Sequence, residues 1–443
     1  MSALSIKPSI KRRGSKSRSE REIRRRGGTT DKEKNQLSLS SKKKISSIER
    51  TAFYYGFKTI PPPKVTKEDL ALARQLTFSE SKTRSTPSNK DECFISVCPE
   101  EKIALLRMYE NGNFMSLPQP AMLFFENEYD KKHSQEKGAG QTRFELEIIG
   151  TAKSVAEAII IQTAMAILRD EGYQNLYVEV NSIGDKDSIA KFTKDLAGFY
   201  RKQLSELPVH CQTTFKNEVF DLFLCQNEKC REIQTKAPQS ISFLSEQSRI
   251  HFREVLEYLE TLNLPYRIKN SLVGNRHFSS HTVFEIRSID SKDDKKDDEG
   301  APLAIGFRYN TLSKRMGLKR ELPAVGISIV CKTKKYTSSS SRSGNIKPKI
   351  YFIQLGFDAK LQSLKVIETL REANIPIYQS LSKDKLAAQI STAEHMKVPY
   401  VLIMGQKEAK ENSVIVRNMM TRSQETVPLK ELPAYLKHIK GHL

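Results

Sequence analysis

Two cysteines, Cys225 and Cys230, lie close together in the middle of this 443-residue chain. Thiolates at such a spacing are typical of one half of a tetrahedral zinc site, which needs a second pair of Cys or His ligands. The other candidates do not form a pair at a recognisable spacing: Cys93, Cys98, His210, Cys211 and Cys331. The sequence therefore predicts no metal site and assigns both thiols to packing.

Other catalytic patterns are missing from the sequence as well. None of the eight histidines stands in an HExxH motif or in a recognisable nucleophile–base arrangement. No GxxxxGK or GxGxxG loop occurs, which excludes P-loop and dinucleotide-binding proteins. No apolar run approaches the roughly 20 residues of a membrane span, and the cysteine usage favours a reducing compartment. We expect a cytoplasmic protein that does not span a membrane.

The charge of the chain points to a polyanionic partner. The formal net charge is +21, from 73 Lys+Arg against 52 Asp+Glu. About half of it lies in residues 1–45, where fifteen basic residues face four acidic ones. That stretch is rich in Ser and Gly and has few apolar residues, so we expect a disordered tail.

Two interpretations of the tail stay open. One is an electrostatic arm that neutralises RNA phosphates. Its candidate contacts are Lys11, Arg12, Arg13, Arg24, Arg25 and Arg26. The other is a solvated tail or a targeting segment, although Glu20 and Glu22 count against a transit peptide.

The pattern of residues 46–335 predicts an α+β domain on an antiparallel sheet. Strands are expected at 144–150, 176–180, 282–287, 303–309 and 324–331, and helices at 154–172, 187–204 and 245–262. Ser154 and Glu157 have the spacing of a capping box at the start of the first of these helices. A Ser-rich stretch at 336–348 is typical of a linker. Residues 349–443 then predict a compact α/β domain with a βαβαβ pattern.

Several short motifs occur in order along this chain. They are GFKTIPPP at 56–63, ELEIIG at 145–150, NSIGD at 181–185, TVFE at 282–285, PAVG at 323–326 and VRNM at 416–419. Together they resemble the histidyl-tRNA synthetase family from about residue 45 onward. The resemblance implies a class II synthetase core over 46–335, an anticodon-binding domain over 349–443 and a homodimer.

The chain departs from this family at its arginines. Amino-acid activation by ATP builds negative charge on a phosphate, and class II enzymes meet that charge with arginine. The motif 2 arginine falls on Glu128 or an immediate neighbour, because no arginine lies between Arg107 and Arg143. The arginine of the histidine-specific loop falls on Gly274, and that of motif 3 on Thr333.

Other pocket groups of the family are only partly retained. Glu100 and Glu147 match family acids, the second of which binds the substrate ammonium, whereas Lys102 replaces a threonine. Phe307 replaces a glycine of the motif GGRYD. Arginines near the implied pocket are Arg143, Arg276 and Arg308. Since one lost anion donor costs about 10²–10³ in rate, we expect a vestigial pocket and no histidine activation.

RNA binding is the property that we expect to be retained. The C-terminal domain keeps most of its family pattern and is basic at Arg417 and Arg422. Lys131 and Lys132 lie in the loop that approaches the tRNA acceptor end in the family. The hypothesis is a tRNA-binding or regulatory protein, with structured RNA as its partner and no cofactor.

Two alternatives stay open at this stage. A divergent histidine–tRNA ligase would use Arg143, Arg276 and Arg308 as substitute anion groups and would need ATP and Mg²⁺. A regulatory subunit of ATP phosphoribosyltransferase resembles the same core, but that family lacks an anticodon-binding domain.

Overall fold

The computed structural model describes nine stretches of the chain. They are 46–78, 99–114, 117–128, 141–225, 227–274, 278–289, 302–332, 348–380 and 385–440. The predicted tail 1–45 and almost all of the predicted linker 336–348 lie outside them. Residues 46–443 form one compact unit.

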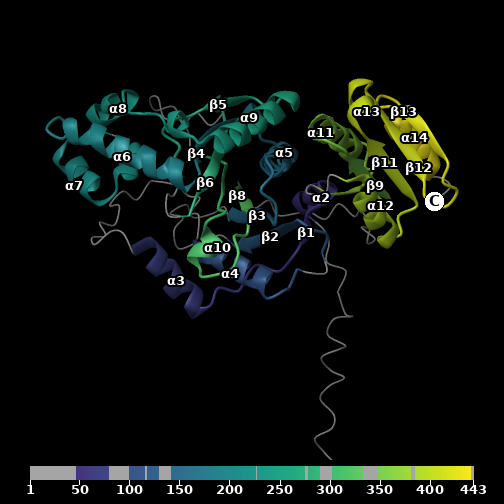
Figure 1. The fold of residues 1–443 in the computed structure, drawn as a ribbon, viewed down its shortest axis with the longest axis horizontal. Coiled ribbons are helices and arrows are strands. Elements are labelled where there is room, and N and C mark those ends of the chain that lie inside the picture. The colour runs from purple at the N-terminus through teal and green to yellow at the C-terminus, as the bar shows by residue number, and fades with distance from the viewer. Residues whose placement is uncertain are drawn as a thin grey trace, which may run out of the picture. The chain divides into compact units, whose positions relative to one another are not determined.

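The larger of two described sheets is mainly antiparallel and has the strand order β1-β2-β3-β8-β7-β6-β4-β5 (Figure 1). The pairs β1–β2 and β4–β5 are parallel. The strands are β1 (Lys58–Thr59), β2 (Ala121–Glu128), β3 (Gln141–Ile149), β4 (Leu176–Gly184), β5 (Tyr266–Ile268), β6 (Ser280–Ser288), β7 (Ala304–Arg308) and β8 (Ala324–Lys332). The predicted α+β core on an antiparallel sheet is confirmed.

Three helices pack together against this sheet: α2 (Ser47–Tyr54), α5 (Val155–Asp170) and α9 (Glu246–Thr261). Every residue of α5 from Val155 to Leu168 is buried, because the helix contacts β3, β8, α2 and α9. This is why its sequence is apolar on almost all sides.

The predicted capping box at the start of α5 is wrong. Ser154 makes no side-chain cap bond, and its hydroxyl instead donates to Glu254 on α9 at 2.5 Å. Glu157 is fully buried and pairs with a cation described below. Both side chains therefore bind residues of other elements and do not cap the helix.

A second apolar cluster lies under α3 (Lys67–Phe78), α4 (Pro99–Glu110) and α10 (Leu312–Arg315). The sequence favours α4 locally, because Pro99 stands at its first position and two acids follow in the first turn. This helix carries Lys102 toward β3, where the candidate site lies.

Residues 185–243 form a small helical region with an apolar cluster of its own. Its elements are α6 (Lys186–Lys202), α7 (Val209–Asn217), the 3₁₀ helix η1 (Val219–Leu224), α8 (Glu228–Thr235) and the 3₁₀ helix η2 (Ser240–Phe243). Asp185 begins α6, accepting a bond from the Ser188 amide at 2.9 Å.

The second sheet has the strand order β10-β9-β11-β12-β13. Its strands are β9 (Ile350–Gln354), β10 (Tyr378–Gln379), β11 (Tyr400–Met404), β12 (Ser413–Asn418) and β13 (Gln424–Pro428). The helices around it are α11 (Phe357–Glu372), α12 (Leu386–His395), α13 (Gln406–Lys410) and α14 (Leu432–Lys440). The predicted pattern holds, but β13 was missed because Val427 alone is buried in it.

Among the described helices, none has the length and apolar character required to cross a bilayer.

Candidate functional site

The candidate site is built on β3, which carries Arg143, Glu145 and Glu147 at alternating positions. Side chains two residues apart in a strand point to the same face, so all three lie together. They are 8%, 1% and 0% exposed. Charged groups this deeply buried need partners of opposite charge.

Lys102 of α4 supplies the central cation. Its ammonium lies 3.1 Å from Oε2 of Glu145 and forms a close ion pair with Glu147. The Tyr309 hydroxyl donates to the other oxygen of Glu147 at 2.5 Å. Ser328 donates to Glu145 at 2.8 Å. The Lys102 side chain is 3% exposed, so this network is closed to solvent.

The pKa values in this network follow from burial and from pairing. Burial alone would lower the pKa of Lys102, but Glu145 and Glu147 more than offset this and raise it. Burial raises the pKa of Glu147 to about 7, against the opposing effect of Lys102. The Lys102 ammonium therefore stays charged. The nearby ammonium is also the main effect that favours the ionised form of Glu147.

Glu147 can lie over β8 because its neighbour there is a glycine. In the register of the sheet Glu147 pairs with Gly326, and a Cβ at that position would come within 2.2 Å of the carboxylate. The glycine of the PAVG motif thus makes room for the acid.

Arg143 faces the same cluster from the other side. Its Nε lies 2.9 Å from Glu145, and its guanidinium pairs with Glu101. Glu101 also accepts a bond from Asn127 at 3.2 Å. The acid that meets Arg143 is thus Glu101, whereas the predicted Glu100 is half-buried in the first turn of α4.

Arg308 lies in a second buried network, with Glu157 of α5. Its guanidinium makes a hydrogen bond for each of its five N–H groups, to both oxygens of Glu157, the carbonyls of Thr151 and Lys153, and the side chain of Asn310. Both partners of the ion pair are fully buried. No N–H of Arg308 is left for a phosphate.

His251 also belongs to this second network. Its Nε2 lies 2.7 Å from Glu157. Burial would raise the pKa of Glu157, but Arg308 and His251 hold it well below its usual range. Burial, together with the charges of His251 and Arg308, lowers the pKa of the neighbouring His281 to about 4, so His281 is neutral at pH 7.

Aromatic and small residues close the remaining space near Tyr309. Phe307, which replaces a glycine of the family, is 4% exposed and packs on Phe278 and Tyr309 at centroid distances of 5.5 and 5.8 Å. Gly274 has φ +60°, and a Cβ there would come within 2.8 Å of Val283. An arginine at position 274 would not fit this backbone.

The other predicted site residues are divided between two places. Arg276, Lys131, Lys132 and the six basic residues of the tail lie outside the described residues. Arg417 and Arg422 lie at one end of the β12–β13 hairpin, where Arg417 pairs with Gln424. The connecting turn also exposes Met420, at 88%.

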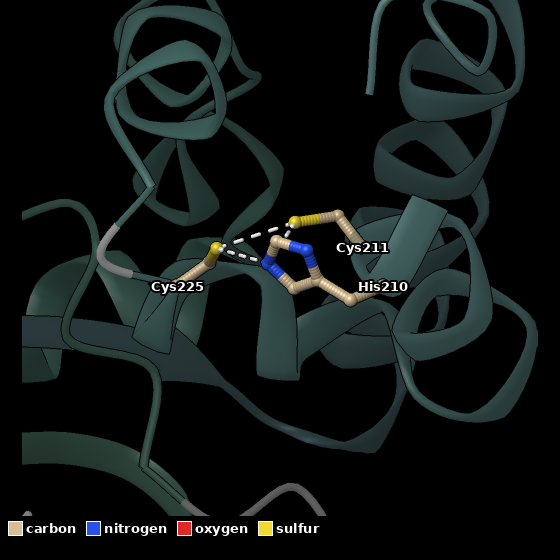
Figure 2. A group of neighbouring side chains, drawn as sticks. All are labelled: His210, Cys211 and Cys225. Atoms are coloured by element: carbon tan, nitrogen blue, oxygen red, sulfur yellow. Dashed lines mark hydrogen bonds between the residues drawn. The ribbon is translucent and has the colours of Figure 1, made fainter. Parts of the chain in front are cut away.

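Three groups that bind metals come together in the helical region. His210 and Cys211 begin α7, and Cys225 follows η1 (Figure 2). Their ligand atoms all lie within 4.8 Å of one another. Sequence spacing did not predict this cluster, because its ligands do not form a second CxxC-like pair. An adjacent His-Cys upstream of Cys225 was the available signal.

Comparisons with known proteins agree with this architecture. A sequence family described as "Anticodon binding domain" matches residues 349–439. The histidine–tRNA ligase of Bacillus velezensis is 27% identical over 377 residues, which cover 83% of this chain and 85% of that protein. The histidine–tRNA ligase of Desulforamulus reducens is 27% identical over 401 residues, which cover 86% and 91%.

A solved structure is similar as well. The crystal structure of apo S. aureus histidyl-tRNA synthetase is 22% identical and covers 91% of this chain and 94% of that chain, with a TM-score of 0.45.

The mainly antiparallel core sheet and the C-terminal anticodon-binding domain define a class II aminoacyl-tRNA synthetase fold. Within that class, the chain is similar to histidine–tRNA ligases over 83–86% of its length.

Proposed function

We propose that this chain binds tRNA, or another structured RNA, and does not activate histidine. The observation that carries the proposal is that the described cations around the implied pocket, Lys102, Arg143 and Arg308, pair with acids of the chain itself. The Lys102 ammonium forms an ion pair with Glu147, and all five N–H groups of Arg308 donate to protein oxygens.

The pairing of Lys102 with Glu147 bears on amino-acid binding. The family resemblance implies that Glu147 corresponds to the acid that binds the ammonium group of the substrate. Here an ammonium from the chain itself already lies on that carboxylate, and the pair is buried. A free histidine would have to displace Lys102 and leave a buried charge unpaired, which is strongly unfavourable.

The arginines bear on ATP. A phosphate that gains negative charge needs preorganised donors, and removing one costs about 10²–10³ in rate. By sequence, the three arginine positions of the family carry Glu128 or a neighbour, Gly274 and Thr333. The described substitutes, Arg143 and Arg308, are paired with Glu101, Glu145 and Glu157. These facts support the loss of activation.

The C-terminal sheet supports the RNA-binding part of the proposal. Residues 349–439 match an anticodon-binding family, and the β12–β13 hairpin carries Arg417 and Arg422 beside the exposed Met420. We include Lys131, Lys132 and the tail 1–45 as further phosphate contacts. The proposal also includes a homodimer and the division of the chain into 1–45, 46–335, 336–348 and 349–443.

We expect tRNA binding that weakens steeply with salt. Each phosphate contact contributes about −0.7 to −0.9 to the slope of log K against log[salt]. The double variant Arg417→Ala/Arg422→Asn should bind more weakly and reduce that slope by about 2 units. Asn is chosen at 422 because that residue has φ +61°, which Asn tolerates.

Filter binding of total tRNA across a salt series measures both quantities. Lys236→Ala is the control, because Lys236 is exposed and paired only with Glu232 of its own helix. Micromolar-or-weaker binding that does not respond to salt, or an unchanged slope in the double variant, would contradict the proposal.

A second candidate function is histidine–tRNA ligase. It is favoured because curated relatives that align over 85–91% of their length carry this name. This function would need ATP and Mg²⁺ at the pocket, and histidine-dependent pyrophosphate exchange separates it from the first candidate.

A further inference from the structure

The helical region brings three metal-binding side chains together, and a fourth, Cys230, lies on the next helix. The Sγ atoms of Cys211 and Cys225 are 3.2 Å apart. Nε2 of His210 lies 3.2 Å from Cys211 and 3.7 Å from Cys225 (Figure 2). Cys230 of α8 is fully buried, and burial together with the nearby Cys225 thiol raises its pKa.

These separations fit a tetrahedral metal site. With Zn–S bonds of about 2.3 Å and Zn–N bonds of about 2.0 Å, neighbouring ligand atoms lie about 3.5–3.8 Å apart. The observed 3.2–3.7 Å requires only a small expansion. A disulfide would instead need about 2.05 Å between the sulfurs, and all four described cysteines are free thiols.

The elements that carry these groups are short. α7 has nine residues, η1 six and α8 eight, and isolated helices of that length are marginal in water. A metal bound to side chains from all three would join them, and its binding energy would add to folding energy.

The surroundings meet two further requirements of a metal site. Cys211 and Cys230 are 1% and 0% exposed, whereas His210 is exposed and Cys225 half-buried, which leaves a path for entry from solvent. The Gln234 side chain donates to the backbone carbonyl of Cys225 at 3.5 Å and thereby links α8 to the segment that carries one ligand.

We propose that His210, Cys211, Cys225 and Cys230 bind one zinc ion. Four protein ligands of the type Cys₃His leave no open position, so the site is structural. It holds the helical region together and takes no part in the proposed RNA binding.

The test begins with the full-length chain, purified without chelator and under reducing conditions. Metal analysis should find about one zinc per chain. Cobalt(II) added to the zinc-free protein should give the visible bands of a tetrahedral site together with thiolate-to-cobalt charge transfer. Zinc should raise the melting temperature of the zinc-free chain, and calcium should not.

Variants then assign the ligands. His210→Ala and Cys225→Ser should each lower zinc affinity by at least about 10-fold, because each removes one of four ligands. The control is Cys331→Ala, a buried cysteine on β8 outside the cluster, which should keep its zinc. Because His210 is exposed, its variant tests the site even where a cysteine variant does not fold.

Three results would overturn the proposal. One is a full-length chain that holds neither zinc nor tetrahedral cobalt after reconstitution. Another is zinc content that is unchanged in both ligand variants. The third is a Cys211–Cys225 disulfide as the stable form of the purified chain, detected by mass spectrometry under non-reducing conditions.

Discussion

A Lys102→Met variant is expected to lose about 3–5 kcal/mol of its free energy of unfolding near pH 8, because removing one partner leaves buried acids uncompensated. Met keeps most of the side-chain volume, so the loss reports the charge and not a cavity. The acids left behind are Glu145 and Glu147, which are 1% and 0% exposed.

The loss should depend on pH in a defined direction. The pKa of Glu147 is already raised to about 7 by burial with Lys102 in place, and without the ammonium it rises further. A carboxyl whose folded pKa is raised stabilises the fold at low pH and loses that contribution as pH rises through the folded pKa. The Lys102→Met variant should therefore be closest to wild type near pH 5 and furthest from it near pH 8.

Urea unfolding followed by far-ultraviolet circular dichroism measures this, since the chain has no tryptophan. The double variant Lys102→Met/Glu147→Gln should recover a large part of the loss, because the unpaired carboxylate is gone. Lys236→Met, at an exposed lysine, is the matched control. A Lys102→Met variant as stable as its control at pH 8 would show that the ammonium does not neutralise Glu147.

The second large effect is expected at Arg308, where Arg308→Met should also cost about 3–5 kcal/mol at neutral pH. Glu157 would be left fully buried with His251 as its remaining side-chain partner in this pair of contacts. The loss should shrink as pH falls toward about 4, because without Arg308 burial raises the pKa of Glu157 and the variant regains stability as that carboxyl takes up a proton, whereas wild type keeps it ionised.

Two further variants separate a structural from a substrate-binding role for Arg308. Glu157→Gln/Arg308→Met should be more stable than Arg308→Met, because both charges are removed together. Arg253→Met, at an exposed arginine on α9, should change stability by no more than about 0.5 kcal/mol. An Arg308→Met variant with wild-type stability would mean that this guanidinium is available to a ligand, which favours the ligase candidate.

Both effects concern the same property of the molecule. Lys102 and Arg308 are cations near the pocket implied by the family resemblance, and each is fully buried against an acid of the chain. In the proposed function their charge stabilises the fold and does not neutralise a substrate. Both substitutions are therefore expected to lower stability, and the proposed function leaves no histidine activation for them to remove.

Much of the fold could be predicted because its elements are locally consistent. Helix α9 begins after Ser245 and the C-terminal βαβαβ pattern matches the structure, since periodicity and caps agree there. Ile250 on α9 is an exception to the burial of apolar residues there, since it is 39% exposed. Strand β13 was missed because a strand with one buried residue has no apolar alternation.

The candidate site was predictable only in part. The sequence placed Glu147 and Arg308 near the pocket, but spacing alone does not reveal that Lys102 and Glu157 are their partners, 45 and 151 residues away. The His210–Cys211–Cys225 cluster was missed for the same reason, since it depends on how α7 packs on η1. Ion pairs and metal ligands between distant elements are properties of the tertiary fold.

Histidine-dependent exchange of pyrophosphate into ATP tests the central claim most directly, because it reports activation without requiring tRNA. An active histidine–tRNA ligase serves as the positive control under the same conditions. The proposal predicts that this chain, folded and able to bind tRNA, gives no exchange above a histidine-free reaction. Exchange that requires histidine, saturates with it and is lost in an Arg308→Met variant would contradict the proposal and identify the chain as a ligase.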